Sequence, residues 1–325
     1  MNVVVTGGAG YIGGTVATLL VRAGHDVTVV DNLCHARREA IPEGVEFVQA
    51  DIADHATMTA LFKLIKPDGV LHFAALIEAG ESMKKPEIYF RNNSAGTLAL
   101  LEAMLAADVK RLVFSSTAAV YGEPEKVPIE ETARLAPTNA YGESKLISEQ
   151  MLRWFEQAHG FRCAVLRYFN VAGALPGRGE EHEPESHLIP LVLDAALGLR
   201  HSIAIFGDDY DTPDGTCIRD YIHVVDLAEA HILALEVLQK QGGLLVNLGN
   251  GEGFSVKQVI ETARRVTEQN IVAELKPRRS GDPARLVASA GRAHAVLGWK
   301  PRHAALEQII DSAWQWHRQR FGKQK

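Results

Sequence analysis

The sequence has few cysteines, no excess of positive charge and no long uninterrupted apolar run. Its three cysteines, Cys34, Cys163 and Cys217, fit neither a disulfide framework nor a zinc motif, which favours a reducing compartment. A net charge of −6 gives no general attraction to nucleic acid or to an anionic membrane. Apolar stretches fall short of the ~18 residues that a spanning helix needs, and no basic segment marks a signal peptide. We therefore expect a cytoplasmic protein with no nucleic-acid or membrane partner.

The chain of 325 residues is long enough for one large or two joined domains, and its first half alternates two kinds of segment. Helix-length segments, such as residues 11–23 and 88–106, follow short β-branched runs that are typical of buried strands. These runs lie at residues 3–6, 27–30, 45–48, 70–73 and 112–114. The alternation predicts an α/β fold with a Rossmann-type, doubly wound parallel sheet.

The second half of the chain is less regular. A further strand at residues 163–169 is followed by a stretch rich in glycine and proline and by an acidic run at residues 180–185. We place a domain boundary there, with a first domain over residues 1–172 and a smaller mixed α/β domain over 173–325. Some crossing of the chain between the two is expected. Helices in the second half are predicted near residues 189–199, 225–238 and 305–318.

A glycine-rich loop at residues 7–13 joins the first predicted strand to the first predicted helix. Glycines there allow a tight turn and close backbone approach to a pyrophosphate, while the helix N-terminus offers unpaired N–H groups. Asp31 ends the next strand, at the spacing of an acid that bonds the ribose hydroxyls of a dinucleotide. Its carboxylate would repel a 2′-phosphate, although Arg37 and Arg38 lie slightly downstream. The pattern predicts NAD rather than NADP, and it outweighs a purely structural glycine turn.

A second glycine-rich stretch lies at residues 249–253. It also follows an apolar strand, residues 244–248, and precedes a helix that Ser255 would cap. No second βαβ unit with a terminal acid surrounds it. We therefore expect a tight structural turn rather than a second nucleotide site.

Tyr141 and Lys145 are four residues apart at the start of a helical pattern, which puts them on one face. A lysine ammonium near a phenol lowers its pKa, and a cationic nicotinamide ring acts in the same direction, so Tyr141 is a candidate general base. Residues 115–117 end the preceding strand at the edge where open α/β sheets bind ligands, and Thr117 there could bond the same substrate oxygen as Tyr141. Each signal alone has a structural explanation, a surface Tyr–Lys pair or hydroxyls that satisfy a strand end. Together they favour a dehydrogenase-like active site.

These motifs and several later ones resemble the extended short-chain dehydrogenase/reductase family and, within it, the nucleotide-sugar epimerases. The likeness covers nearly the whole chain. The glycine loop and Tyr-x-x-x-Lys are shared by the superfamily, whereas the later motifs are typical of nucleotide-sugar enzymes. Further matching motifs are residues 31–32, 51–52, 73–75, Asn93, 115–117, 168–170, 219–224 and 278–279 with Asp282.

The resemblance implies reversible epimerisation at C4 of UDP-glucose and UDP-galactose, through a transient 4-keto sugar and tightly bound NAD. In this cycle Tyr141 takes the proton of the 4-hydroxyl, Thr117 positions that oxygen and Lys145 bonds the nicotinamide ribose. Related dehydratases carry an Asp-Glu pair after the threonine. Here those positions are Ala118 and Ala119, which favours epimerisation over elimination. A nucleotide-sugar 4-reductase, a UDP-glucuronate epimerase and a non-catalytic NAD-sensing protein remain alternatives.

The resemblance also implies which residues bind the two ligands. For NAD they are Gly7, Gly10, Tyr11, Ile12, Gly13, Asp31, Asn32, Asp51, Ile52, Phe73, Ala74, Ala75, Asn93, Ser115, Tyr141, Lys145 and Tyr168. For the UDP-hexose they are Thr117, Tyr141, Asn170, Leu188, Phe206, Arg219, Tyr221, Arg279, Asp282 and Leu286. It further implies a homodimer joined through the helices at residues 88–106 and 141–159.

Two positions bear on how closely the chain follows these relatives. Many of them carry a lysine where this chain has Ile77, followed by Glu78, so a positive charge near the nicotinamide is missing. By the same resemblance, Leu286 would stand at the gate of the sugar pocket, and it is larger than the residue found in enzymes that accept N-acetyl sugars. We therefore expect a preference for UDP-glucose and UDP-galactose.

His182 and His187, within an acidic segment, are the remaining candidates for a site of their own. Imidazole and carboxylate groups are common metal ligands. Because no regular element is predicted to fix their geometry, we expect an acidic, solvated loop and no metal.

Overall fold

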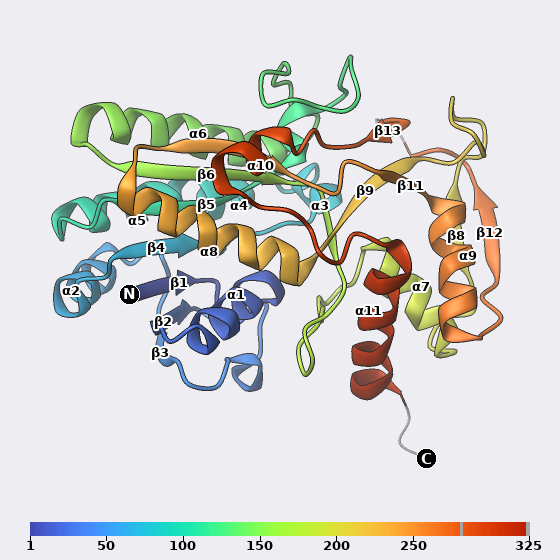
Figure 1. Cartoon of the computed structure of the whole chain (residues 1–325), viewed down its shortest axis with the longest axis horizontal. Helices are drawn as coiled ribbons and strands as arrows, with labels where there is room; N and C mark the ends of the chain where they lie inside the picture. The colour runs from blue at the N-terminus through green and yellow to red at the C-terminus, as the bar shows by residue number, and fades with distance from the viewer. Residues whose placement is uncertain (280–281, 323–325) are drawn as a thin grey trace.

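The computed structural model describes residues 1–279 and 282–322 of the chain. A seven-stranded sheet forms its centre, in the order β10-β6-β5-β4-β1-β2-β3, and every neighbouring pair is parallel (Figure 1). The strands are β1 (Asn2–Thr6), β2 (Asp26–Asp31), β3 (Glu46–Gln49), β4 (Gly69–His72), β5 (Arg111–Thr117), β6 (Arg162–Tyr168) and β10 (Leu244–Leu248). The strand order reverses between β1 and β4, and such a switch point opens a crevice at the carboxyl edge of the sheet.

Helices cover both faces of this sheet. Alternate strand residues point to opposite sides, so Val3 and Val5 join one apolar cluster while Val4 joins the other. The first face packs against α1 (Tyr11–Arg22), α8 (Val224–Lys240) and α10 (Gly291–Leu297). The second packs against α2 (His55–Ile65), α5 (Gly96–Ala106) and α6 (Ala140–His159). The predicted Rossmann-type, doubly wound fold is confirmed.

The helix predicted over residues 88–106 is interrupted. It consists of α4 (Pro86–Tyr89), a π-helical turn η2 (Phe90–Ala95) and α5. Within the wide turn, the side chain of Asn93 accepts from the N–H of Leu76 at 2.9 Å and donates to its carbonyl at 3.0 Å. This tie joins the turn to the loop after β4, and π turns of this kind often occur at functional sites.

Most of the second half forms a separate group of elements, on the right of the view in Figure 1. Strand β9 (Ile218–His223) pairs with β7 (Asn170–Ala172), β11 (Gly253–Ser255) and β13 (Arg285–Leu286), while β8 (Ile203–Phe206) pairs with β12 (Ala273–Lys276). Their core packs against α7 (Leu188–Ala196), α9 (Val256–Thr267) and α11 (Leu306–Phe321). The chain crosses back to give β10, α8 and α10 to the central sheet. Short elements complete the path at α3 (Ala79–Ser82), η1 (Arg38–Ala40) and η3 (Ala118–Tyr121).

The glycine-rich stretch at residues 249–253 is a structural turn, as predicted. Gly251 has φ +75°, and the buried carboxylate of Asp220 accepts the N–H groups of Asn250 at 2.7 Å and Gly251 at 3.0 Å. The stretch leads into β11, and Ser255 caps α9 by accepting from Gln258 N at 3.1 Å. Across the described residues, no helix combines the length and apolar character that crossing a membrane requires.

Candidate active site

The loop between β1 and α1 is folded tightly at the edge of a cleft. Gly7 has φ +72°, and a Cβ atom there would lie 2.5 Å from the backbone nitrogen of Ala74. A side chain at Gly13 would collide with the carbonyl oxygen of Gly7. Gly10 is the N-cap of α1, and no side chain of the described residues caps this helix. The tight loop and the uncapped helix N-terminus together fit a bound pyrophosphate.

Asp31 lies beside this loop at the end of β2. Its carboxylate accepts the N–H of Ala9 at 3.1 Å and that of Leu33 at 2.8 Å, which fixes its orientation. Next to it, Asn32 donates to the carboxylate of Asp51 at 2.9 Å. Each of these side chains lines the cleft. The rim thus offers oxygen acceptors suited to sugar hydroxyls and unsuited to a phosphate.

The cleft, with its open mouth, encloses about 1000 Å³ between the glycine loop and α6. Every residue assigned to NAD by the resemblance lines it except Asn93, which holds Leu76 in the lining by its side-chain amide. The lining residues from that set are Gly7, Gly10, Tyr11, Ile12, Gly13, Asp31, Asn32, Asp51, Ile52, Phe73, Ala74, Ala75, Ser115, Tyr141, Lys145 and Tyr168. The lining also includes residues that no sequence motif indicated, among them Cys34, His35, Leu76 and His182. Leu76 directly follows a matched motif, but His182 reaches the cleft only through the tertiary fold.

Tyr141 stands in the first turn of α6, whose N-terminus is capped by Asn139 accepting from Gly142 N at 2.8 Å. Burial raises the pKa of Tyr141 to about 12, while a hydrogen bond with Thr117 opposes the rise and the charge of Glu78 adds to it. Thr117 therefore lies beside Tyr141, and their shared contact with one substrate oxygen stays a prediction. In the chain by itself, burial thus raises the phenol pKa, and the expected lowering by Lys145 is not seen.

Lys145 follows one turn later and is almost completely buried, with 3% of its surface exposed. Its ammonium donates to the carbonyl of Ser115 at 2.9 Å and lies 4.9 Å from the centre of the Phe114 ring. Burial lowers the pKa of Lys145 to about 7, although the charge of Glu149 opposes this. Nearby, burial and the charge of Lys145 lower the pKa of His72 to about 3, so this histidine is neutral. The ammonium is thus held in place, and its pKa of about 7 lies near neutral pH.

A buried polar network, which no sequence motif indicated, lies behind strand β5. Ser116 donates to Glu149 at 2.5 Å, and Arg167 binds both carboxylate oxygens of Glu149 at 3.0 and 2.5 Å. Arg167 also donates to the hydroxyl of Tyr121 at 3.0 Å, which in turn donates to Asn247 at 2.6 Å. The one signal available in the sequence is the position of Glu149, one turn after Lys145. The network ties β5, α6, β6 and β10 together directly behind Thr117.

The residues assigned to the UDP-hexose, apart from Thr117 and Tyr141, form a second group. The guanidinium of Arg279 lies 3.9 Å from the centre of the Phe206 ring, and Arg219 pairs with Asp282 at 2.5 Å. Strand pairing sets Asn170 opposite Tyr221 and Leu286 opposite Arg219, and Leu188 begins α7. In the part of the chain that the structure describes, these eight residues lie outside the lining of the cleft. They are Asn170, Leu188, Phe206, Arg219, Tyr221, Arg279, Asp282 and Leu286.

Comparison with known proteins agrees with this arrangement. Residues 3–249 match the NAD dependent epimerase/dehydratase family. The UDP-glucose 4-epimerase of Halalkalibacterium halodurans is 53% identical over 98% of this chain and 96% of the relative. A crystal structure of a UDP-glucose 4-epimerase, 50% identical, superposes with a TM-score of 0.97 and covers 100% of both chains.

A second solved relative is a complex with NAD. It is the UDP-glucose 4-epimerase from Brucella ovis in complex with NAD, 42% identical, with a TM-score of 0.95 over 97% of this chain and 98% of that one. These likenesses extend over the glycine loop, the cleft and the second group of residues alike. This chain is a member of the NAD dependent epimerase/dehydratase family.

Proposed function

We propose that this protein interconverts UDP-glucose and UDP-galactose by epimerisation at C4, with NAD as a tightly bound cofactor. The observation that carries the proposal is that Tyr141 and Lys145 line a cleft that begins at an NAD-type glycine loop, with Thr117 beside Tyr141. Full-length likeness to proteins named UDP-glucose 4-epimerase supports the choice of substrate.

The residues of the cleft fit NAD on physical grounds. Gly7 and Gly13 leave no room for side chains, so the backbone can approach a pyrophosphate closely. Asp31 and Asn32 offer acceptors for ribose hydroxyls, and Lys145 offers a donor to the ribose next to the nicotinamide. When bound, NAD supplies an acceptor for the hydrogen on C4 and a positively charged ring.

Tyr141 is the residue that moves the proton. Its pKa of about 12 means that it carries a proton in the chain by itself, so a function as base requires positive charge nearby. Lys145 and the positive ring would supply that charge, whereas Glu78 opposes it. Thr117, bonded to Tyr141, would hold the 4-hydroxyl oxygen while its proton leaves. Return of the proton by the same tyrosine, together with the hydride that the cofactor would give back to C4, completes the cycle with no net oxidation.

The second group of residues would hold the nucleotide while the 4-keto sugar rotates to present its opposite face. Arg219 and Arg279 present planar donor forks that match phosphate oxygens, and Phe206 and Tyr221 add aromatic surface. Asn170, Leu188 and Asp282 would complete the UDP site. Leu286 would narrow the sugar pocket, so kcat/KM should be higher for UDP-galactose than for UDP-N-acetylgalactosamine. Equal values for the two would contradict this part of the proposal.

We extend the proposal to the assembly and to the division of labour within the chain. Residues 1–172 would bind NAD and residues 173–325 would supply most of the contacts to the UDP-sugar, in a cytoplasmic homodimer. Trp154 on α6 is 60% exposed and Leu98 on α5 is 37% exposed, which favours α5 and α6 as the contact between subunits. Sedimentation should find a dimer, and Trp154→Glu should shift it towards monomer.

One assay separates the candidate activities. The purified protein is incubated with UDP-galactose, without added NADH, and UDP-glucose is measured by chromatography. Formation of UDP-glucose up to a constant ratio supports the epimerase. A 4-reductase would start from a keto sugar and consume reductant in stoichiometric amounts, and an NAD-sensing protein would leave the sugar unchanged.

A further inference from the structure

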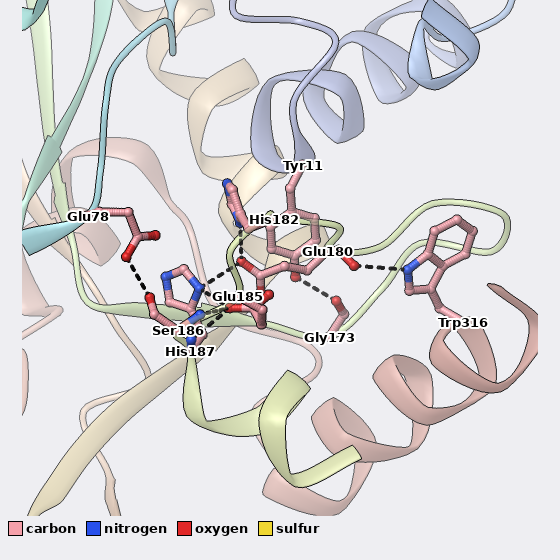
Figure 2. A network of polar contacts seen from close by, with 9 residues as sticks. All are labelled: Tyr11, Glu78, Gly173, Glu180, His182, Glu185, Ser186, His187 and Trp316. Carbon is pink, nitrogen blue, oxygen red and sulfur yellow. Dashed lines mark hydrogen bonds and ion pairs between the residues drawn. The ribbon is translucent and has the colours of Figure 1, made fainter. Parts of the chain in front are cut away.

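A compact cluster of histidines and carboxylates lies in the segment between β7 and α7 (Figure 2). Glu180, His182, Glu185 and His187 each present one nitrogen or oxygen, and these atoms lie within 4.8 Å of one another. Nδ1 of His182 is 2.8 Å from Oε1 of Glu180, and Nδ1 of His187 is 3.2 Å from the same oxygen. Nδ1 of His187 is also 2.8 Å from Oε1 of Glu185. Donor atoms of four side chains thus converge on one point.

A solvated loop was expected here, but the side chains of the cluster are largely buried. The side chains of Glu180 and Glu185 are only 8% and 15% exposed, and those of His182 and His187 are 28% and 40% exposed. Two carboxylates withdrawn from water at this spacing repel each other unless positive charge lies between them. A divalent cation at the point where the four donors meet would supply that charge.

The surrounding backbone fixes the segment at several points. The indole of Trp316 on α11 donates to the carbonyl of Glu180 at 3.3 Å, and the N–H groups of Ser186 and His187 donate to Glu185, each at 2.7 Å. The hydroxyl of Ser186 donates to Glu78 at 2.8 Å, in the loop after β4 (Figure 2). Elements from both halves of the chain therefore hold the donors before any ion binds, and such preorganisation favours metal binding.

The chemistry of the donors indicates the class of ion. Two imidazole nitrogens with two carboxylate oxygens suit Zn²⁺ and related transition ions, whereas Mg²⁺ and Ca²⁺ prefer oxygen ligands alone. Metal–ligand distances of about 2.0–2.2 Å place tetrahedral ligands about 3.3–3.6 Å apart. Three of the observed separations are 2.8 to 3.2 Å and all lie within 4.8 Å, so movements of about 1 Å reach that geometry.

We propose that Glu180, His182, Glu185 and His187 bind one Zn²⁺-class ion that fastens this segment against the cofactor cleft. His182 lines the cleft itself, and the hydroxyl of Tyr11, next to the glycine loop, donates to the carbonyl of Gly173 at 2.5 Å at the start of the segment. The ion would hold the segment closed over the cleft. Four protein ligands fill the tetrahedral coordination sphere and leave no position for a substrate, so the role is structural. It is independent of the proposed activity.

The test measures metal binding by the full-length protein after treatment with a chelator and transfer to metal-free buffer. Zn²⁺ is titrated in competition with a chromophoric chelator, and Mg²⁺ is tested separately. We expect one Zn²⁺ site per chain, weakened at least 100-fold in the double variant His182→Ala/His187→Ala. The matched control is His55→Ala/His294→Ala, which removes two exposed histidines on α2 and α10 and should bind as the wild type does.

A second readout uses the midpoint of thermal unfolding. Zn²⁺ should raise it for the wild type and the control, since an ion that binds only the folded state stabilises that state, and should not raise it for the double variant. If the double variant does not fold, His182→Gln takes its place in both measurements. The absence of a stoichiometric site in the wild type, equal binding by variant and control, or equal binding of Mg²⁺ would overturn the proposal.

Discussion

Two arginine–carboxylate pairs, one on each side of the proposed active site, have the same shortest distance and different surroundings. Arg167 and Glu149 approach to 2.5 Å with side chains 3% and 6% exposed, behind the catalytic strand β5. Arg219 and Asp282 also approach to 2.5 Å, but their side chains are 12% and 30% exposed, in the second group of residues. Glu149 also accepts a hydrogen bond from Ser116, whereas the Asp282 side chain is partly exposed to solvent.

This difference separates a fixed side from an exchangeable side. A buried ion pair cannot give up one partner without leaving an uncompensated charge, so the catalytic side is built before any ligand binds. A partly exposed pair costs less to open, so Arg219 could exchange Asp282 for a phosphate while its bonds to two backbone carbonyls hold it in place. We therefore expect changes on the catalytic side to affect turnover and folding, and changes on the other side to affect substrate affinity.

The largest effect should come from Tyr141→Phe. Loss of the general base is expected to lower kcat by about 10³-fold, within the range for proton transfer by a positioned side chain, while KM changes little. Steady-state assays of UDP-galactose conversion give both constants. Tyr89→Phe, which removes a phenol hydroxyl bonded to Glu81 at 3.2 Å outside the cleft, is the control and should keep its kcat. A Tyr141→Phe enzyme with near-normal kcat would remove Tyr141 from the mechanism.

Breaking the buried pair should have the next largest effect. Glu149→Leu leaves the Arg167 guanidinium buried without its carboxylate, and we expect about 3–5 kcal/mol of lost stability. Asp282→Leu removes a half-exposed partner and should cost about 1 kcal/mol or less. Denaturant unfolding of the three proteins measures both changes. Similar losses for the two variants would contradict the distinction between the two sides.

Only part of the fixed side could be predicted from the sequence, and the reason is physical. The glycine loop, Asp31 and residues 115–117 each follow a strand, and parallel strands deliver their carboxyl ends to one edge. Tyr141 and Lys145 share a helix face by spacing alone. In contrast, Arg167 meets Glu149 across 18 residues and Tyr121 across 46, so no local period marks the network. The cluster at Glu180 and His187 likewise depends on contacts from α11 and from the loop after β4.

On the exchangeable side, Arg219→Lys should raise KM for UDP-galactose about tenfold and leave kcat nearly unchanged. Lysine keeps the charge but loses the planar fork that binds two phosphate oxygens, a loss of about 1.4 kcal/mol. The control is Arg302→Lys. Arg302 lies outside the cleft lining and is not among the proposed UDP-binding residues. Its guanidinium pairs with Glu229 at 3.3 Å, and 73% of its side chain is exposed. A fall in kcat with constant KM would place Arg219 on the catalytic side instead.

The smallest effect concerns Lys145 and pH. Because burial lowers its pKa from 10.5 to about 7, the folded chain holds fewer protons at this site than the unfolded chain between those values. Stability should then rise with pH, since the unfolded state binds more protons, and the penalty of burying the ammonium is greatest below pH 7. From pH 7 to pH 8 the gain in stability from this group is about 1 kcal/mol.

Lys145→Met removes the titrating group and serves as the matched comparison, so the difference in slope between the two proteins isolates Lys145. The measurement is denaturant unfolding of the NAD-free protein at each pH. Equal slopes would mean that the ammonium keeps its ordinary pKa, and the fixed side would then hold a full positive charge beside Tyr141 at neutral pH.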